Sequence, residues 1–285
     1  MGVDIALLSP PSAFPDGDAA PERSDGTHSG VPALQPSPGG VAERFSRRVG
    51  AENPVRVFTV ALLCGYALLV GVMILLGLAL IDLVLPIGGL EDADQDLNEW
   101  IVGQRTPTLE DISWVGSTLA GGLVIPAVIG ICLLALLVTR NWLLAAFVLF
   151  VVVLESGTYS ATTLVIHRDR PDVARLESLP VDASFPSGHT AASIALYGGL
   201  LLLIASKLNN TAIKVAALLV GIAIPLFVGA SRMYRGMHHI TDTGAGILLG
   251  LGALAVLVFA SRAASAAANR RDARRSETTQ EVATT

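Results

Sequence analysis

Residues 185–242 decide the fold, because they place two polar motifs at the ends of two apolar runs. The stretch opens with FPSGH (residues 185–189) and closes with SRMYRGMHHITD (residues 231–242). The runs between them, residues 190–206 and 212–230, consist mainly of Ala, Gly, Ile, Leu and Val. Histidines and arginines are therefore expected where apolar helices begin and end.

The composition of the whole chain excludes an ordinary soluble domain. Of the 285 residues, 52% are hydrophobic and 15% are charged, whereas charged residues make up about a quarter of a typical soluble domain. The net charge of −5 gives no case for nucleic-acid binding. Cys64 and Cys132 lie inside apolar runs, so no disulfide framework is predicted, and no His/Cys cluster has zinc-ligand spacing.

Several apolar runs approach the length of about 20 residues that a helix needs to cross a bilayer. We therefore predict an all-α fold, a six-span transmembrane helix bundle. Residues 44–260 form the membrane domain, between a disordered N-terminal tail (residues 1–43) and a polar, disordered C-terminal tail (residues 261–285). The expected spans are Val57–Leu83, Val115–Val138, Trp142–Ile166, Thr190–Ser206, Ala212–Ala230 and Gly244–Ala260.

The distribution of Lys and Arg predicts the orientation, because cytoplasmic loops are enriched in them. With six spans, most basic residues fall on one side of the membrane, and both termini lie on that side. We predict that this side is the cytoplasm. The first opposite loop, residues 86–111, is acidic. The other two opposite loops hold the polar motifs, and their arginines break the charge rule. An arginine on that side is explained if it meets a bound anion.

His238 and Asp242 are spaced four residues apart, so in a helix their side chains share one face. A carboxylate that accepts the proton of one imidazole nitrogen fixes the tautomer and leaves the other nitrogen free to attack. Such an imidazole can attack phosphorus and form a phosphohistidine. A structural His–Asp pair near the membrane surface explains this spacing equally well, and His239 competes for the same role.

Ser187 and Gly188 precede His189 at the predicted start of a membrane helix. Serine is a favoured N-cap residue, and glycine lets the backbone come close to a ligand. The first turn of a helix attracts anions through its free N–H groups and its dipole. A protonated His189 can donate to a leaving oxygen as a general acid. By itself, Pro-Ser-Gly is also explained by a plain turn before a helix.

Arg170 and Arg232 supply planar, permanently charged donors that suit phosphate oxygens. A single arginine at such a place more often keeps its charge at the membrane surface and buries only its stem. Two arginines that flank two histidines favour a phosphate site, where positive charge matches the transferring phosphoryl group.

These motifs resemble those of the type 2 phosphatidic acid phosphatase family, membrane lipid phosphatases that share an active site with vanadium haloperoxidases. The family's second motif, Pro-Ser-Gly-His, stands at residues 186–189. Its third motif is Ser-Arg, five residues, His, three residues, Asp, and residues 231–242 match that spacing. The resemblance covers about residues 100–260 and implies a six-span bundle without a metal or another cofactor.

The resemblance also implies roles for individual residues. His238 would be the nucleophile, Asp242 its orienting carboxylate and His189 the general acid. The implied phosphate-binding residues are Arg170, Arg232, Ser187 and Gly188.

The family's first motif, Lys, six residues, Arg-Pro, is only partly present. Its arginine is matched by Arg170, but Thr163 stands at the lysine position. In a helix Thr163, His167 and Arg170 share one face, so we hypothesise that His167, or the adjacent Arg168, supplies the missing charge. The alternative is that His167 only caps the helix. Glu155, a carboxylate inside the third span, is either functional or a buried hydrogen-bonding residue.

The sequence therefore predicts an integral membrane phosphatase that hydrolyses lipid phosphate or diphosphate headgroups at the extracytoplasmic face. Its expected partners are the bilayer and a lipid such as undecaprenyl diphosphate, phosphatidic acid or phosphatidylglycerol phosphate, and the Ala-rich composition favours a bacterial cell membrane. A phosphotransferase with an alcohol acceptor is one alternative. A non-catalytic lipid-phosphate binding or transport protein is another, although no internal repeat favours transport.

Overall fold

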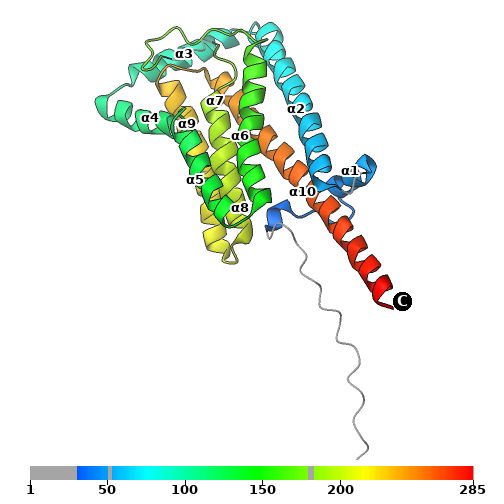
Figure 1. Cartoon of the computed structure of the whole chain (residues 1–285). Coiled ribbons are helices and arrows are strands. Elements are labelled where there is room, and N and C mark those ends of the chain that lie inside the picture. The colour runs from blue at the N-terminus through cyan, green and yellow to red at the C-terminus, as the bar shows by residue number, and fades with distance from the viewer. Residues whose placement is uncertain (1–30, 51–52, 179–182, 285) are drawn as a thin grey trace, which may run out of the picture.

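The computed structural model describes residues 31–50, 53–178 and 183–284, and all regular elements in these ranges are helical. In Figure 1, long helices form a bundle, α3 lies across one end, and the C-terminus of α10 projects at the other. The elements are η1 (Pro32–Leu34), α1 (Val41–Val49), α2 (Pro54–Ala79), η2 (Leu80–Val84), α3 (Leu90–Gly103), α4 (Pro107–Leu119), α5 (Val124–Val138), α6 (Trp142–Thr163), α7 (Gly188–Ser193), η3 (Ile194–Gly198), α8 (Gly199–Lys207), α9 (Thr211–Tyr234) and α10 (Ile240–Thr284).

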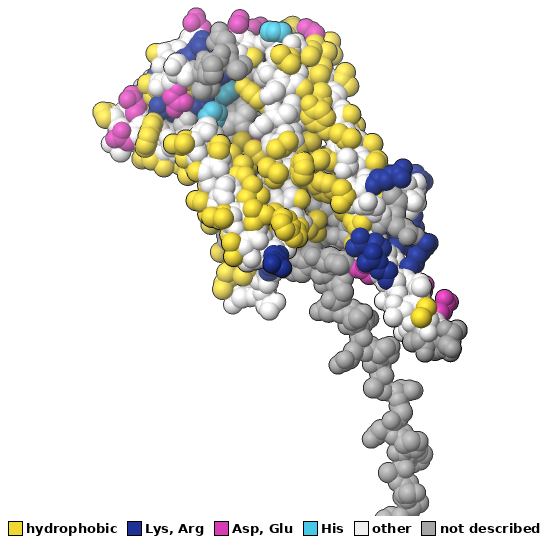
Figure 2. All heavy atoms as spheres, viewed as in Figure 1, with side chains coloured by type: hydrophobic (Ala, Val, Ile, Leu, Met, Phe, Trp, Pro, Cys, Tyr) yellow, Lys and Arg dark blue, Asp and Glu magenta, His cyan; other side chains and the backbone are white. Residues whose placement is uncertain are grey.

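The predicted six-span all-α bundle is confirmed. Five helices of the described chain are long and apolar enough to cross a membrane, and the bent pair α4 and α5 makes a sixth when the two helices are counted as one span. Figure 2 shows hydrophobic side chains over the middle of the visible face, acidic side chains near α3 and α4, and basic side chains near α1 and the end of α10. Such a broad exposed apolar surface is typical of contact with lipid.

Capping residues extend two of the spans beyond their apolar runs. Asn53 caps α2, where its side chain accepts a hydrogen bond from the Val55 N–H at 2.9 Å and Pro54 takes the first helical position. Asn210 caps α9 in the same way, through the Ala212 N–H at 2.9 Å. Each cap thereby satisfies at least one free N–H group of the first turn.

The second span is broken, which differs from the continuous helix predicted over residues 115–138. α4 ends at Leu119, α5 begins at Val124, and the two helices are bent by 45°. Ala120-Gly121-Gly122 lies between them, and glycine is a poor helix former. The bend leads into α5, which forms one wall of the cavity described below.

The C-terminal segment also differs from the predicted disordered tail. α10 does not end at Ala260 but continues to Thr284. Ala263 and Ala267 of this extension are buried in a small apolar cluster with residues of α1 and α2. This burial, together with the good helix propensity of alanine, explains why the helix does not end with the apolar run.

Of the predicted N-terminal tail, residues 1–30 lie outside the described residues. The rest is partly ordered, because Val31 and Leu34 are fully buried. The Ala33 carbonyl accepts a hydrogen bond from Arg262 Nε of α10 at 2.8 Å. The segment before α1 is therefore attached to the same helix as the C-terminal extension.

α10 contacts α1, α2, α6 and α7, so it links most of the bundle. Its contact with α7 depends on Gly250. A Cβ atom at Gly250 would lie 2.7 Å from the Ala191 carbonyl oxygen and 2.7 Å from Ile194 Cβ. This close approach brings the start of α7, with His189, next to the loop that precedes α10.

We expect Gly250→Ala to lower the free energy of unfolding by about 2 kcal/mol, because the added methyl group meets backbone rather than a flexible side chain. Thermal unfolding in detergent measures the effect. Gly244→Ala is the matched control on the same helix, since a Cβ atom there meets nothing within 4 Å. Equal unfolding midpoints for the two variants would contradict this account of the α7–α10 contact.

Candidate active site

His238 lies in the short loop between α9 and α10. Gly236 in this loop has a φ of 72°, a left-handed conformation that favours glycine. The His238 residue is 2% exposed, and its Nδ1 lies 2.9 Å from the backbone carbonyl oxygen of Ser184. Because a carbonyl oxygen only accepts, this contact requires the proton on Nδ1 and leaves Nε2 of the neutral ring with its lone pair.

The surroundings of His238 favour that neutral ring. Burial lowers the pKa of the His238 imidazole well below its usual range, and the positive charges of Arg232, Arg170 and His189 lower it further. The hydrogen bond to the Ser184 carbonyl acts in the opposite direction but is the smallest cause. At neutral pH, His238 is therefore in the form that a nucleophile needs.

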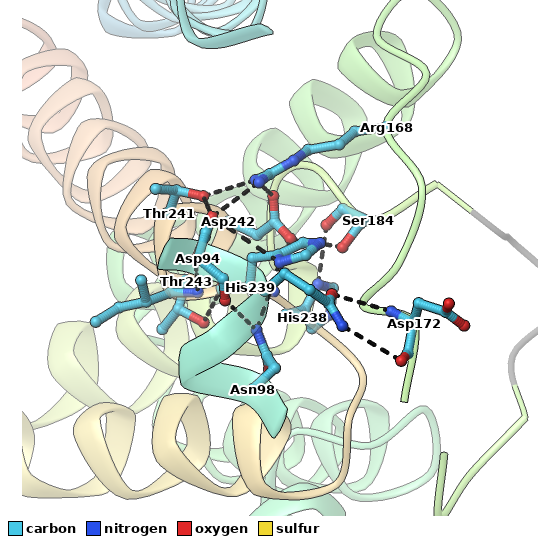
Figure 3. A network of polar contacts seen from close by, with 12 residues as sticks. Asp94, Asn98, Arg168, Asp172, Ser184, His238, His239, Thr241, Asp242 and Thr243 are labelled. Atoms are coloured by element: carbon cyan, nitrogen blue, oxygen red, sulfur yellow. Dashed lines mark hydrogen bonds and ion pairs between the residues drawn. The ribbon is translucent and has the colours of Figure 1, made fainter. Parts of the chain in front are cut away.

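Asp242 is the centre of the polar network beside His238 (Figure 3). Its fully buried carboxylate accepts hydrogen bonds from Ser184 Oγ at 2.5 Å, from the His239 N–H at 2.9 Å and from Arg168. No hydrogen bond joins it to the ring of His238 within the described network, which differs from the predicted direct pair. Ser184 connects the two residues, because its hydroxyl donates to Asp242 and its carbonyl accepts from His238.

Arg168 is held between two carboxylates. Its guanidinium donates to Asp242, to Asp94 at 2.8 Å and to Thr241 Oγ1 at 2.6 Å. Asp94, on α3, also accepts from the Ile240 N–H at 3.0 Å. The hypothesis that Arg168 replaces the missing lysine as a phosphate ligand is therefore not supported, since its charge is neutralised inside this network.

His167 lies away from the predicted site. α6 ends at Thr163, so Thr163, His167 and Arg170 do not continue along one helical face as predicted. His167 is exposed and does not line the cavity that contains His189 and His238. Nothing in this geometry lets His167 supply the missing charge.

Arg232 is fully buried and has two nitrogen atoms without a partner. Its Nη1 donates to Ser117 Oγ at 2.7 Å and to Glu177 at 2.5 Å, whereas Nε and Nη2 are buried without a hydrogen-bond partner among the described residues. Buried donors left in this state are costly. A bound anion with two oxygens removes that cost, because a guanidinium can bind phosphate through two N–H groups.

Glu177 holds Arg232 in place. Its carboxylate also binds Arg235, so it bridges two arginines. Burial alone raises the pKa of Glu177, but Arg232, a hydrogen bond with Ser117 and Arg235 together lower it below its usual range. Glu177 is therefore ionised at neutral pH, and it fixes one nitrogen of Arg232 while the other two stay unbonded.

The motif of residues 186–189 begins α7 as predicted, with Gly188 as the first helical residue. Ser187 Oγ does not cap a backbone N–H but lies 2.9 Å from Thr190 Oγ1. The Ser187 N–H donates to the backbone carbonyl of Asp242 at 3.0 Å, which joins the two motifs. A Cβ atom at Gly188 would lie 3.0 Å from the Tyr159 ring, so glycine permits close packing here.

His189, His238 and Arg170 line one cavity of about 660 Å³, together with Gly188. Its other walls are apolar residues of α5 and a set of α6 residues that includes Glu155, Ser156 and Tyr159. Arg170 is fixed at the wall, since it donates to the Met237 carbonyl at 2.5 Å. Among the described residues, no group of three or more His, Cys, Asp and Glu side chains is arranged to hold a metal ion.

Three residues of this arrangement do not belong to any recognised motif: Asp94, Ser184 and Glu177. Asp94 is one of several acidic residues in the loop of residues 86–111. Ser184 and Glu177 lie in the irregular segment between α6 and α7. No spacing in the sequence distinguishes them from their neighbours, because each acts through a contact with a distant segment.

A protein-family model described as the PAP2 superfamily matches residues 142–265. This range contains Arg170 and the two motifs at residues 186–189 and 231–242, so the resemblance read from the motifs is confirmed. No curated protein matches the chain in sequence.

Two solved structures resemble the fold. The first is the transmembrane PAP2-type phosphatidylglycerolphosphate phosphatase from Bacillus subtilis, with 22% identity, a TM-score of 0.57, and coverage of 73% of this chain and 94% of that chain. The second is LpxE from Aquifex aeolicus, with 23% identity, a TM-score of 0.45, and coverage of 57% and 92%. The first of these supports the transmembrane fold.

We expect Asp94→Ala to lower the free energy of unfolding by about 3 kcal/mol, because it leaves the buried Arg168 with one carboxylate fewer. Chemical or thermal unfolding in detergent measures this loss. Asp96→Ala on the exposed side of α3 is the control and is expected to stay within about 0.5 kcal/mol of the parent. A similar loss of unfolding free energy in both variants would show that the Asp94–Arg168 ion pair contributes no more to stability than an exposed carboxylate does.

We expect His238 to stay neutral when the pH falls through 6.5, since its pKa is depressed by burial. In protein with labelled histidines, the ring signal that disappears in His238→Gln identifies His238. That signal should not shift between about pH 7.5 and 5.5, whereas an unperturbed histidine titrates near pH 6.5. Titration of the assigned signal near pH 6.5 would contradict this assignment.

Proposed function

We propose that the chain is an integral membrane lipid phosphatase of the PAP2 superfamily, which acts through a phosphohistidine. One observation carries this proposal. A buried, neutral His238 lines the same cavity as His189 and Arg170, and Arg232 keeps two unpartnered N–H groups in the same motif. A nucleophile, a candidate acid and unused positive charge are the groups that phosphoryl transfer requires.

The proposed reaction has two steps. Nε2 of His238 attacks phosphorus, the bond between phosphorus and the lipid oxygen breaks, and His189 gives its proton to that oxygen. Water then attacks the phosphohistidine, His189 accepts a proton from it, and inorganic phosphate leaves with His238 restored. Arg170 and Arg232 stabilise the charge on the phosphate oxygens throughout.

Asp242 and Ser184 are assigned positioning roles in this scheme. The Ser184 carbonyl keeps the proton of His238 on Nδ1, and the Ser184 hydroxyl is bound to Asp242. Asp242 therefore acts on the nucleophile through Ser184. The predicted assignment of Asp242 as the orienting residue is kept in this indirect form.

The cavity is proposed to open on the extracytoplasmic side, with both termini in the cytoplasm. The basic residues of α1 and of the end of α10 lie far from α3, at which the polar network is found (Figures 1 and 2). Since cytoplasmic segments are enriched in Lys and Arg, this asymmetry supports the orientation. Lipids of the outer leaflet that carry a phosphate or diphosphate headgroup are then the proposed substrates.

The proposal is tested by release of inorganic phosphate from a panel of lipid phosphates by the purified protein in detergent. We expect activity that persists in EDTA, falls with vanadate, and drops on the order of a thousandfold or more in His238→Gln, which lacks the nucleophile. His167→Ala is the control and should keep the parent activity, because His167 is exposed outside the cavity.

Three results would contradict the proposal or its mechanism. Binding of lipid phosphates without release of phosphate would favour the non-catalytic binding protein. Transfer of the phosphoryl group to an added alcohol in preference to water would favour the phosphotransferase. Full activity in His238→Gln would exclude the proposed nucleophile even if the protein is a phosphatase.

A further inference from the structure

Glu155 is a buried carboxylate that the proposed reaction does not use. It lies on α6, is 2% exposed, and lines the same cavity as His189, His238 and Arg170. Among the described residues, the only hydrogen bond to its carboxylate comes from the neighbouring Ser156 Oγ at 3.0 Å, and no ion pair reaches it. A buried carboxyl group with a single hydrogen bond is poorly satisfied inside a membrane span, so its position at this wall suggests that a ligand supplies a further partner.

The position of Glu155 along α6 shows which part of a ligand it meets. Tyr159 lines the cavity four residues later on the same helical face, and its ring packs beside Gly188. At a rise of about 1.5 Å per residue, Glu155 is about 6 Å further into the bundle than Tyr159. A phosphate held at His189 and His238 therefore points its lipid portion toward Glu155.

The two walls of the cavity differ in polarity. The wall formed by α6 presents Glu155 and Tyr159, whereas the wall formed by α5 presents Ile125, Ile129 and Leu133. A lipid in this cavity thus meets hydrogen-bonding groups on one side and hydrocarbon on the other. This arrangement fits a lipid that has a polar group beside its phosphate ester and an apolar chain beyond it.

We propose that Glu155 is a specificity-determining residue that accepts a hydrogen bond from a hydroxyl or amine group next to the phosphate ester of the substrate. This inference rests on the proposed phosphatase function. A lipid with such a donor satisfies the buried carboxylate, whereas an isoprenoid phosphate offers only hydrocarbon and leaves it unpaired. Sites that are built to bind a substrate O–H or N–H group discriminate strongly against analogues that lack it.

The test compares substrates with and without the donor at equal mole fractions in mixed micelles. Lysophosphatidate supplies a free hydroxyl group, a long-chain-base phosphate supplies an amine, and polyprenyl phosphate supplies neither. For the parent protein, we expect kcat/KM to be about tenfold higher, or more, for one or both donor-bearing lipids than for polyprenyl phosphate. The two donor-bearing lipids distinguish a hydroxyl from an amine as the preferred group.

Variants of Glu155 then separate recognition from stability. Glu155→Leu should lower kcat/KM about tenfold for the preferred lipid, mainly through KM, and leave polyprenyl phosphate unchanged or faster. Glu155→Gln keeps an acceptor oxygen and should retain most of the preference. Thr158→Val is the matched control, because Thr158 is buried on α6, its hydroxyl donates to the Leu154 carbonyl of the same helix, and it does not line the cavity. It should change all substrates by the same factor.

An equal loss for every substrate in Glu155→Leu would overturn this inference and assign Glu155 a structural role. A parent enzyme that prefers polyprenyl phosphate would overturn it as well. Both results leave the proposed phosphatase function intact. Failure of the parent protein to release phosphate from any of these lipids would instead overturn the proposed function, and this inference with it.

Discussion

The rest of the structure depends on the contacts that the buried carboxylate of Asp242 makes. Through Arg168 it reaches Asp94 on α3, and through Ser184 it reaches the segment before α7. Loss of one member destabilises the whole network, because an arginine left without its carboxylates would be an uncompensated buried charge. Three segments that are distant in sequence are therefore fixed at one end of the bundle, and His238 is fixed with them.

The network also separates two kinds of positive charge. Arg168 is neutralised by Asp94 and Asp242, whereas Arg232 shares one nitrogen with Glu177 and keeps two nitrogens unbonded. Within this site, Arg232 therefore keeps N–H groups for the phosphate that is proposed to bind, whereas the charge of Arg168 is already neutralised. The neutral His238 beside it fits this division, because burial and nearby arginines both disfavour its protonation.

Much of the fold and part of the site could be predicted from local sequence. Apolar runs predict the spans because a bilayer demands about 20 apolar residues, and the motifs place His189, His238 and Arg170 near one another. The predicted helical face shared by Thr163, His167 and Arg170 is wrong because α6 ends at Thr163, which an apolar run does not reveal. Asp94, Ser184 and Glu177 were missed because nothing in their own neighbourhood marks them.

The sequence by itself determined the helical, membrane-spanning class and the motifs whose residues are proposed to perform phosphoryl transfer. These properties depend on short-range spacing, which is visible along the chain. Only the tertiary structure decided which carboxylate meets which arginine, since Asp94 and Arg168 are 74 residues apart yet form an ion pair. Such pairs form because helix packing brings their elements together and because buried polar groups must find partners.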